Sequence, residues 1–425
     1  MNTANYKKVI NGWAMYDWAN SVYNLVITTT FFPAYYAAVT STDNFPNGIS
    51  FLGRTYVNTE LKDYVLAAGF LIIALLSPIL SSIADYKGNK KQFMRFFCYL
   101  GAFSCSLLYF FDKNNITMGL MAFMFAGIGF YGSQVFYNSY LPEIATEADM
   151  DKVSAKGYTM GYIGSVILQL IGFAMVMTMD DKGLALTLTF LLVGLWWAGF
   201  AQISFSRLPS GNRSERMSKK HFLVNGFHEL KLVWNQVSNM PVLKKYLASF
   251  FFYSMGVQTV MLCAIDFGIK VLKLENQKLI ITAVIIQLVA IAGAMMISRL
   301  STIIGNFKTL IICVLIWIVI CISGYFVESE SQFYILAALV GLIMGGIQSL
   351  SRSTYSKLMP ETKDTASFFS FYDVTEKMAI VIGLFSFGFI EGITHDMRKS
   401  LLALIAFFVV GLLFLLMANA SKKQQ

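Results

Sequence analysis

Residues 11–38 read NGWAMYDWANSVYNLVITTTFFPAYYAA, an almost unbroken apolar run with one acidic residue, Asp17, near its start. The run is long enough to cross a bilayer, since a membrane-spanning helix needs about 20 mostly apolar residues. A charge at the centre of the bilayer costs at least about 2.5–3.5 kcal/mol. The run therefore predicts a membrane segment, and Asp17 is a candidate functional residue.

The rest of the chain repeats this apolar character. Of the 425 residues, 56% are hydrophobic and 13% are charged, whereas soluble domains carry about 25% charged residues. We predict an all-α membrane protein with twelve transmembrane helices and mostly short connections. The predicted spans are 13–39, 62–83, 93–111, 116–140, 157–178, 184–205, 244–269, 278–300, 307–327, 332–356, 366–390 and 398–419.

One long connection divides the twelve spans into six and six. We predict an N-terminal six-helix bundle over 1–205, a cytoplasmic central loop over 206–243 and a C-terminal six-helix bundle over 244–425. Within the loop, apolar residues recur at helical spacing, which predicts an amphipathic helix lying at the membrane surface. These residues are Leu223, Phe227, Leu230 and Trp234.

Lysine and arginine predict the orientation, because they collect on the cytoplasmic side of a membrane protein. With the N-terminus inside, 23 of the 33 basic residues fall on inner segments and 9 on outer segments, and Lys377 lies within a span. Both termini are therefore predicted to be cytoplasmic. This topology accounts for the net charge of +9, so we expect no nucleic-acid partner. The N-terminus has the pattern of neither a secretory signal nor a transit peptide. We expect a multi-pass monomer in a bacterial inner membrane.

The positions of the cysteines and histidines favour neither a metal site nor covalent catalysis. The cysteines sit in apolar runs without metal-ligand spacing, and the histidines fall in predicted loops. The cysteines are Cys98, Cys105, Cys263, Cys313 and Cys321, and the histidines are His221, His228 and His395. Glycine-rich phosphate loops of the kind that ATP-driven proteins use are absent from the sequence. We expect no cofactor and no metal site, and we do not expect an enzyme.

The two halves have similar sequences at two of their connections. The segments after the second and the eighth span are SSIADYKGNKKQF (81–93) and SRLSTIIGNFKTL (298–310). They align on Gly88 and Gly305, and the fourth span of each half ends on a proline–glutamate pair, at 142–143 and 360–361. Internal repeats are typical of transporters, so the matches favour two pseudo-symmetric halves. The alternative is that glycine, proline and lysine recur wherever short cytoplasmic turns are built.

The first of these connections resembles the loop motif of the major facilitator superfamily, roughly G-x-x-x-D-R-x-G-R-K. The matching residues are Asp85, Gly88, Lys90 and Lys91, and the departures are Ser81, Tyr86 and Asn89. The resemblance implies that Asp85 and the basic residues restrain the loop and stabilise an outward-open state. The alternative is a solvated turn with the basic charge typical of the inner side.

The segment YDWANSVYNLVITTTFFPAYY (16–36) is more specific. It resembles the first-helix signature of the vacuole-effluxer branch, which comprises the autophagy-related amino-acid effluxers and their bacterial relatives. The resemblance continues through FYNSYLPEIA (136–145), GYTMGYIGS (157–165), GVQTV (256–260), GGIQSLSRSTYSKLMP (345–360) and FFSFYDVTEKMA (368–379). It implies a major facilitator fold and solute efflux, with amino acids as the substrate class. The chain departs from the family at Ser254 and Met255, where an Asn-Asp pair is usual, and at Glu376, where a small residue is usual.

In the major facilitator fold, helices 1, 4, 7 and 10 line a central cavity. The resemblance implies that their polar residues bind the substrate. The candidates are Asn20, Tyr23, Gln134, Tyr137, Asn138, Tyr253, Gln258 and Gln348. Helical spacing places several of them on shared faces, such as Asn20 with Tyr23 and Gln134 with Asn138. Amides and hydroxyls with few charges suit a small zwitterion or a neutral polar solute.

Two charges in opposite halves are predicted at similar depths. Asp17 lies about one turn inside the predicted first span, and Arg352 lies about one turn from the inner end of the tenth. An ion pair between Asp17 and Arg352 could act as an inner gate. The alternative is that Asp17 caps its helix or reaches the cytoplasm, because carboxylates are stabilised at helix N-termini.

The eleventh predicted span carries three charges near its middle. Asp373 and Lys377 are four residues apart, so they can pair on one helix face. This pairing leaves Glu376 without a partner close in sequence. Burial disfavours the charged form of a carboxylate, and a carboxylate that takes up a proton readily is what proton coupling needs. We therefore predict coupling or gating roles for Asp17, Arg352, Asp373, Glu376 and Lys377.

Together these features predict a secondary active transporter that works by alternating access. Proton-coupled amino-acid efflux is the specific hypothesis, and its substrate class rests on the resemblance. The expected partners are the lipid bilayer, a small-molecule substrate and a proton or another ion. A rival of the same class is an exporter of amphiphilic drug-like or lipid-like compounds. A non-transporting membrane sensor or enzyme is the rival of a different class.

Overall fold

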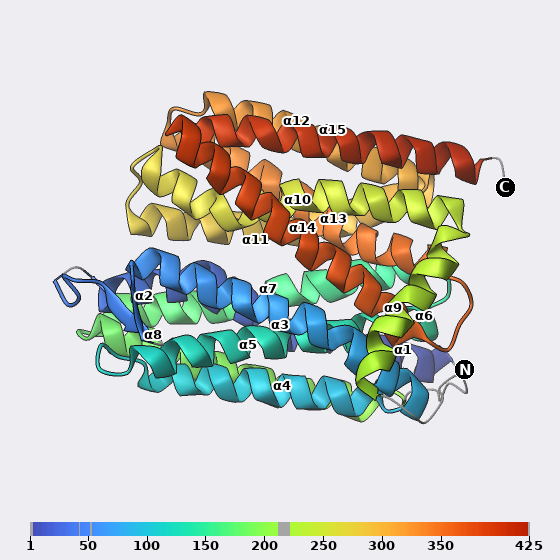
Figure 1. Cartoon of the computed structure of the whole chain (residues 1–425), viewed down its shortest axis with the longest axis horizontal. Coiled ribbons are helices and arrows are strands. Elements are labelled where there is room, and N and C mark those ends of the chain that lie inside the picture. Colours follow the sequence, from blue (N-terminus) through green and yellow to red (C-terminus); the bar gives the residue numbers. More distant parts are fainter. Residues whose placement is uncertain (1–2, 42, 52, 211–221, 424–425) are drawn as a thin grey trace. The chain divides into compact units, whose positions relative to one another are not determined.

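The chain folds into two compact units, whose elements are labelled in Figure 1. The computed structural model describes residues 3–41, 43–51, 53–210 and 222–423. Unit 1 comprises residues 1–137 and 160–217, and unit 2 comprises residues 138–159 and 218–425. The predicted bundles over 1–205 and 244–425 stay a prediction. The structure adds that the segment 138–159 packs with the second unit.

Helices make up nearly all of the described chain, as the all-α prediction requires. The first elements are α1 (Thr3–Val22), η1 (Tyr23–Phe31), α2 (Phe32–Val39), β1 (Ile49–Phe51), β2 (Arg54–Tyr56), α3 (Asn58–Lys87), α4 (Lys90–Leu107), η2 (Leu108–Phe110), α5 (Ile116–Asn138), α6 (Leu141–Ile144), α7 (Met150–Thr178) and α8 (Lys182–Arg207). The remaining elements are α9 (Phe222–Ser238), α10 (Pro241–Lys270), α11 (Asn276–Ile304), α12 (Asn306–Phe326), α13 (Glu330–Leu358), α14 (Thr365–Thr394) and α15 (Met397–Lys422). The two strands form an antiparallel hairpin in which Ser50 pairs with Thr55.

Eleven helices of the described ranges are long and apolar enough to cross a membrane. They correspond to the second to twelfth predicted spans. The first predicted span, 13–39, is also helical throughout, but it lies in a run of three pieces, α1, the π-helical η1 and α2. The polar residues of α1 make it less apolar than the other eleven helices, and η1 divides the run.

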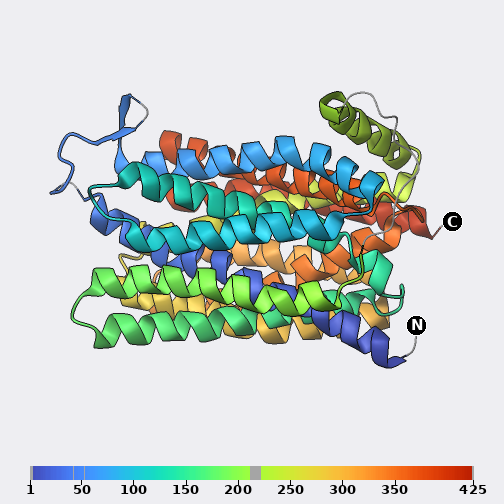
Figure 2. The ribbon, with the colours of Figure 1, turned by 90° about the horizontal axis from the view of Figure 1, so that it is seen from below.

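Each unit is held together by close packing between its own helices. In unit 2, α15 packs against α10 and α12, and α11 packs against α13; α12 and α15 lie side by side in Figure 1. In unit 1, α8 packs against α1 and α4, and the short connection from α7 to α8 makes these two helices a hairpin (Figure 2). Lipid tails are as apolar as leucine, so such helices associate through van der Waals fit rather than through escape from water.

The amphipathic helix expected in the central loop is present as α9. The Trp234 ring lies 6.0 Å from the Phe371 ring of α14 and 5.9 Å from the Lys244 ammonium of α10. Leu230 is half-buried, while Leu223 and Phe227 fall outside the residues whose side chains are described. The α9 helix therefore packs on unit 2 through its C-terminal part, and its place at the membrane surface stays a prediction.

Both glycines of the aligned connections adopt backbone angles that favour glycine. Gly88 ends α3 in the left-handed region, with φ 66° and ψ 30°. Gly305 separates α11 from α12 with φ 88° and ψ 156°, a region that is essentially restricted to glycine. The matching positions of these two turns agree with the predicted repeat.

We expect Gly305→Ala to destabilise the protein by about 1–3 kcal/mol, the usual cost of holding a residue in such a region. A Cβ at Gly305 meets no atom within 4 Å, so the cost comes from the backbone alone. Gly199 of α8 is the matched control, because a Cβ there also meets nothing but its backbone is helical. Thermal unfolding in detergent should show a lower midpoint for Gly305→Ala and an unchanged or higher midpoint for Gly199→Ala. Equal midpoints would show that Gly305 relaxes without cost.

Candidate functional site

The three charges of α14 form a connected cluster inside unit 2. The Lys377 ammonium lies 2.9 Å from Asp373 Oδ1, which confirms the pair expected from their spacing. Both side chains are buried, at 4% and 8% exposure. Asp373 Oδ2 is also buried and has no hydrogen-bond partner. The ion pair therefore lies in a poorly hydrated place, where removing either partner is costly.

The expectation that Glu376 lacks a nearby partner is wrong. Glu376 Oε2 lies 3.4 Å from the Lys377 ammonium, and Oε1 accepts a hydrogen bond of 3.0 Å from Gln258 Nε2. Adjacent residues in a helix point in different directions, but the long lysine side chain reaches both carboxylates. Glu376 thus shares one ammonium with Asp373 and links α14 to α10. Its side chain is 24% exposed, more than that of Asp373 or Lys377.

A second set of hydrogen-bonded polar side chains in unit 2 joins α10 to α13. The Tyr253 and Ser351 hydroxyl oxygens lie 2.7 Å apart, and Ser351 Oγ donates to Ile347 O. Because a serine hydroxyl has one hydrogen, Tyr253 is the donor in its bond to Ser351. The Tyr246 hydroxyl donates to Ser351 O at 2.7 Å. Tyr253, a candidate substrate ligand, is thus buried and hydrogen-bonded to its own unit.

Arg352 connects α13 to the segment 138–159 within unit 2. Its Nε donates to Ser154 Oγ at 2.9 Å, one terminal nitrogen donates to Ser154 O at 2.9 Å, and the other donates to Asn138 Oδ1 at 3.0 Å. The guanidinium also lies 4.4 Å from the centre of the Tyr158 ring. Arg352 is 2% exposed, and Ser154 in turn donates to Ser349 O. Asn138, which is predicted to bind the substrate, here accepts a hydrogen bond from Arg352.

Asp17 lies in unit 1, where it accepts a hydrogen bond of 2.7 Å from the Tyr137 hydroxyl. Tyr137 is itself fixed by Trp13, whose ring stacks on it at 4.5 Å and whose indole nitrogen donates to Tyr137 O. The alternative that Asp17 caps its helix is wrong, because α1 begins at Thr3, about 21 Å along the axis from Asp17. Asp17 is also almost fully buried. Its proposed ion pair with Arg352 stays a prediction.

The other predicted ligands differ in how accessible they are. Asn20, Tyr23, Tyr137 and Tyr253 are buried, and Gln134, Asn138, Gln258 and Gln348 are half-buried. Tyr23 packs between the rings of Phe130 and Trp197 inside unit 1. Asn20 is fully buried, and neither oxygen nor nitrogen of its amide has a hydrogen-bond partner. An unpaired buried polar group costs about 1–3 kcal/mol, and the role of Asn20 as a substrate ligand stays a prediction.

The loop motif has a well-defined geometry. Gly88 reverses the chain after α3, and the Lys91 ammonium donates to Leu208 O at 2.7 Å, which ties the start of α4 to the end of α8. The Asp85 and Lys90 side chains are buried. A freely solvated turn would expose such charges, so the structure argues against that alternative for these two residues.

Sequence reasoning missed a buried carboxylate, Asp151, in the first turn of α7. The Lys357 ammonium and the Ser301 hydroxyl lie 2.7 and 2.8 Å from Asp151 Oδ2, and the Asn306 amide donates to Oδ1 at 2.9 Å. The acidic stretch around it, EIATEADMDK, reads as loop structure in the sequence. Nearby, Thr365 donates to Glu143 Oε1 at 2.7 Å. Two features of the sequence could have indicated this carboxylate. Asp151 stands near the start of a helix, where carboxylates are stabilised, and its partners Ser301 and Asn306 flank the repeated turn at Gly305.

The described residues include no group of three or more histidine, cysteine, aspartate or glutamate side chains that could hold a metal ion. Cys98, Cys105, Cys313 and Cys321 are buried, and Cys263 is half-buried.

Comparisons with known proteins agree with the resemblance. A family model described as "Vacuole effluxer Atg22 like" matches residues 5–425. The chain is 31% identical, over 96% of its length and 94% of the relative's length, to the uncharacterized MFS-type transporter YxiO of Bacillus subtilis (strain 168). It is 22% identical, over 93% of its length and 73% of the relative's length, to autophagy-related protein 22 of Pyricularia oryzae.

Solved structures show the same fold. The transporter FucP in its outward conformation matches with a TM-score of 0.71 at 13% identity, over 97% of this chain and 98% of that one. The human organic anion transporter MFSD10 matches with a TM-score of 0.72 at 10% identity, over 96% and 98%. FucP is a major facilitator superfamily transporter, so its match confirms the predicted major facilitator fold. At such low identity, these matches say nothing about the substrate.

Proposed function

Because this chain belongs to the vacuole effluxer family, whose members include major facilitator transporters, we propose that it exports a small zwitterion, an amino acid, by proton-coupled alternating access. The location in a bacterial inner membrane with cytoplasmic termini belongs to the same proposal. The observation that carries it is the cluster of Asp373, Glu376 and Lys377, in which two carboxylates share one ammonium.

The charge of this cluster favours the uptake of one proton. With all three groups ionised, the cluster carries a net charge of −1, and a buried uncompensated charge is unfavourable. One proton makes the cluster neutral. Glu376 is the group that we propose takes it, because it lies farther from the Lys377 ammonium than Asp373 does, 3.4 Å against 2.9 Å, and its greater exposure lets a proton reach it. Asp373 then remains the fixed partner of Lys377.

Protonation of Glu376 would also change the link between helices. Ionised Glu376 attracts Lys377 and accepts from Gln258 at the same time. The neutral acid loses the attraction to Lys377, and it accepts a weaker hydrogen bond from Gln258 of α10, because an ionised acceptor binds a donor about twice as strongly as a neutral one. An event at one residue thus changes how α14 holds α10. Alternating access needs such a change, because a bound proton must favour one conformation over the other.

The substrate class rests on the family and on the polar groups of α10 and α13. Gln258 and Gln348 are half-buried, and an amide carries both donors, which suit a carboxylate, and an acceptor, which suits an ammonium group. These groups suit a compact zwitterion better than a polyanion. An amphiphilic solute remains the rival substrate class, and the test below separates the two.

The test uses the purified protein in liposomes that contain a pH-sensitive dye. Amino acids and amphiphilic compounds are screened for solute-driven proton movement, with wild type, Glu376→Gln and Glu391→Gln compared. Glu391 is the matched control, because it lies on the same helix but pairs with Lys270 at a more exposed position. We expect amino acids to drive proton movement in wild type and in the control, and Glu376→Gln to retain solute exchange without proton movement.

Other results would contradict parts of the proposal. Proton movement with amphiphiles but not with amino acids would overturn the substrate class. Accumulation of labelled amino acid without proton movement in wild type would overturn proton coupling. If coupling persists in Glu376→Gln and is lost in Asp17→Asn, the coupling carboxylate is on α1 instead.

A further inference from the structure

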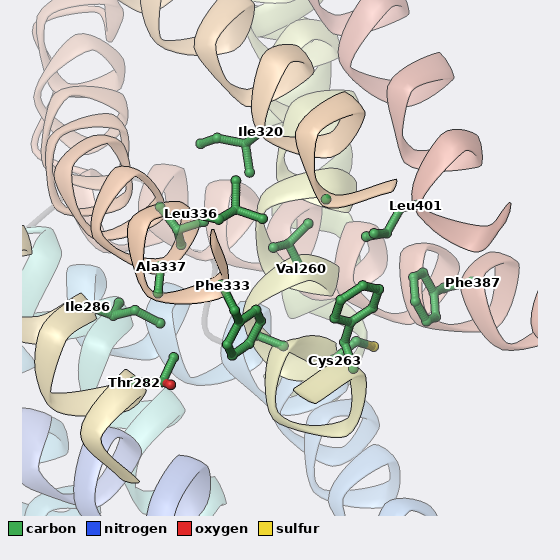
Figure 3. A pocket seen from close by; sticks show the side chains of 14 residues that line it. Val260, Cys263, Thr282, Ile286, Ile320, Phe333, Leu336, Ala337, Phe387 and Leu401 are labelled. Carbon is green, nitrogen blue, oxygen red and sulfur yellow. The ribbon is translucent and has the colours of Figure 1, made fainter. Parts of the chain in front are cut away.

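Unit 2 contains an apolar cavity of about 60 Å³ among α10, α11, α12, α13, α14 and α15 (Figure 3). This volume is several times the 10–15 Å³ or so that one water molecule needs. The residues named in the figure belong to all six helices, and nearly all of them are aliphatic or aromatic. The charged cluster of α14 takes no part in the lining, so the cavity is separate from the site described above.

Water is a poor occupant of this cavity. A buried water needs two to four polar partners. The one hydroxyl in the lining belongs to Thr282, and it already donates to Lys278 O at 2.8 Å. The thiol of Cys263 is only a weak hydrogen-bonding group. An empty cavity is also unfavourable, because the atoms that line it lose their dispersion contacts on one side.

The cavity lies close to one end of its helices. On α10 its lining runs from Val260 to Phe267, and on α13 from Phe333 to Val340. The lining is therefore within about 15 Å of the ends at Lys270 and Glu330, by the rise of an α-helix. The half-exposed ion pair of Lys278 with Glu330 marks the same end as polar. That depth corresponds to one leaflet of a bilayer, whose hydrocarbon core is about 30 Å thick.

The cavity is not sealed within the unit. Four of the residues that line it are half-buried, so part of each reaches the surface of unit 2. They are Cys263, Ala264, Leu336 and Leu401. The lining is therefore not fully enclosed, and entry of an apolar group at these residues is part of the proposal below.

We propose that this cavity binds a segment of a membrane lipid's alkyl chain. The chain supplies the missing dispersion contacts and needs no polar partner. Alkyl chains surround every membrane-spanning protein at high concentration, so mass action favours this ligand over a dilute solute. The occupant is a methylene segment of a lipid chain, held by side chains of α10 and α13, and its binding does not depend on the transported solute.

The test uses the protein in nanodiscs that contain a phosphatidylcholine with a photoactivatable diazirine on its acyl chain. Labelled residues are mapped by mass spectrometry after irradiation. We expect labelling of 260–267 and 333–340 on their cavity side. Ala337→Leu, which fills the cavity from α13, should lose this labelling. Ala264→Leu, which fills it from α10, is a second variant in case the first folds poorly. Gly388→Leu is the control, because a side chain there meets open space on α14.

Two outcomes would overturn the proposal. If Ala337→Leu and Ala264→Leu are labelled at these residues as strongly as wild type, the label comes from the outer surface and the cavity is an empty packing void. If an amino acid or an amphiphilic solute displaces the label from wild type at micromolar concentration, the occupant is part of the transported solute rather than a lipid. Loss of labelling in both filling variants, with the Gly388→Leu control unchanged, supports the proposal.

Discussion

Replacing Lys377 by methionine is expected to abolish coupled transport and to destabilise the protein by about 3–5 kcal/mol, the usual cost of removing one partner of a buried ion pair. Without the ammonium, Asp373 and Glu376 lie near each other in a buried place with no cation beside them. The proposed coupling step depends on Glu376 giving up its attraction to the Lys377 ammonium, and this variant has no ammonium to release. Thermal unfolding and the liposome assay measure the two effects.

A double variant separates folding from coupling. Asp373→Asn with Lys377→Met removes both members of the buried pair, and the more exposed Glu376 keeps its hydrogen bond from Gln258. Replacement of a buried ion pair by neutral groups is often close to neutral for stability. We expect the double variant to unfold near the wild-type temperature but still to lack coupled transport, because Glu376 has lost its ammonium. Lys270→Met, at an exposed pair on α10, is the control for the loss of a lysine. If the double variant recovers coupled transport together with stability, Lys377 is only structural.

The α14 cluster also shows how far sequence reasoning reaches. Asp373 and Lys377 are one helical turn apart, so their pair follows from spacing. The Gln258–Glu376 hydrogen bond joins residues 118 positions apart, and no local pattern predicts it. The contacts of Asp151 could not be predicted for the same reason, since its partners on α11, α12 and α13 lie 150 or more residues away in the sequence. An acidic residue in a polar connection looks solvated until the fold brings a lysine to it.

The fold was easier to predict than the site, because each span needs only its own apolar residues. Eleven spans follow from length and composition. The first span shows the limit of that reasoning. Its helix begins at Thr3, well before the apolar run, because residues 3–12 continue the helix although they are too polar to belong to the apolar run. That extension puts Asp17 deep inside a helix, and it removes the capping role that the apolar boundary suggested.

Arg352→Lys is expected to destabilise unit 2 by about 3 kcal/mol or more, since each hydrogen bond to a charged group contributes about 1.5–3 kcal/mol. The guanidinium donates three bonds, to Asn138 Oδ1, Ser154 Oγ and Ser154 O, and it lies over Tyr158. A lysine ammonium keeps the charge but not the planar fork, so it cannot reproduce this set. Thermal unfolding should show a clearly lower midpoint. Arg299→Lys on α11 is the control, because Arg299 is exposed.

The same substitution should shift the conformational equilibrium if the segment 138–159 is released during transport. Its bonds to Arg352 are present in this state, so weakening them favours any state in which they are broken. A cysteine placed at Gln348, one turn from Arg352 on α13, reports that state when a membrane-impermeant thiol reagent is added from the side of the C-terminal end of α13. All three proteins carry the cysteine at 348, and labelling at the native cysteines is subtracted. We expect this cysteine to be labelled faster with Arg352→Lys than with arginine at 352 or with Arg299→Lys. Equal labelling rates together with a lowered unfolding midpoint would mean that Arg352 stabilises unit 2 but does not hold the transporter in one state.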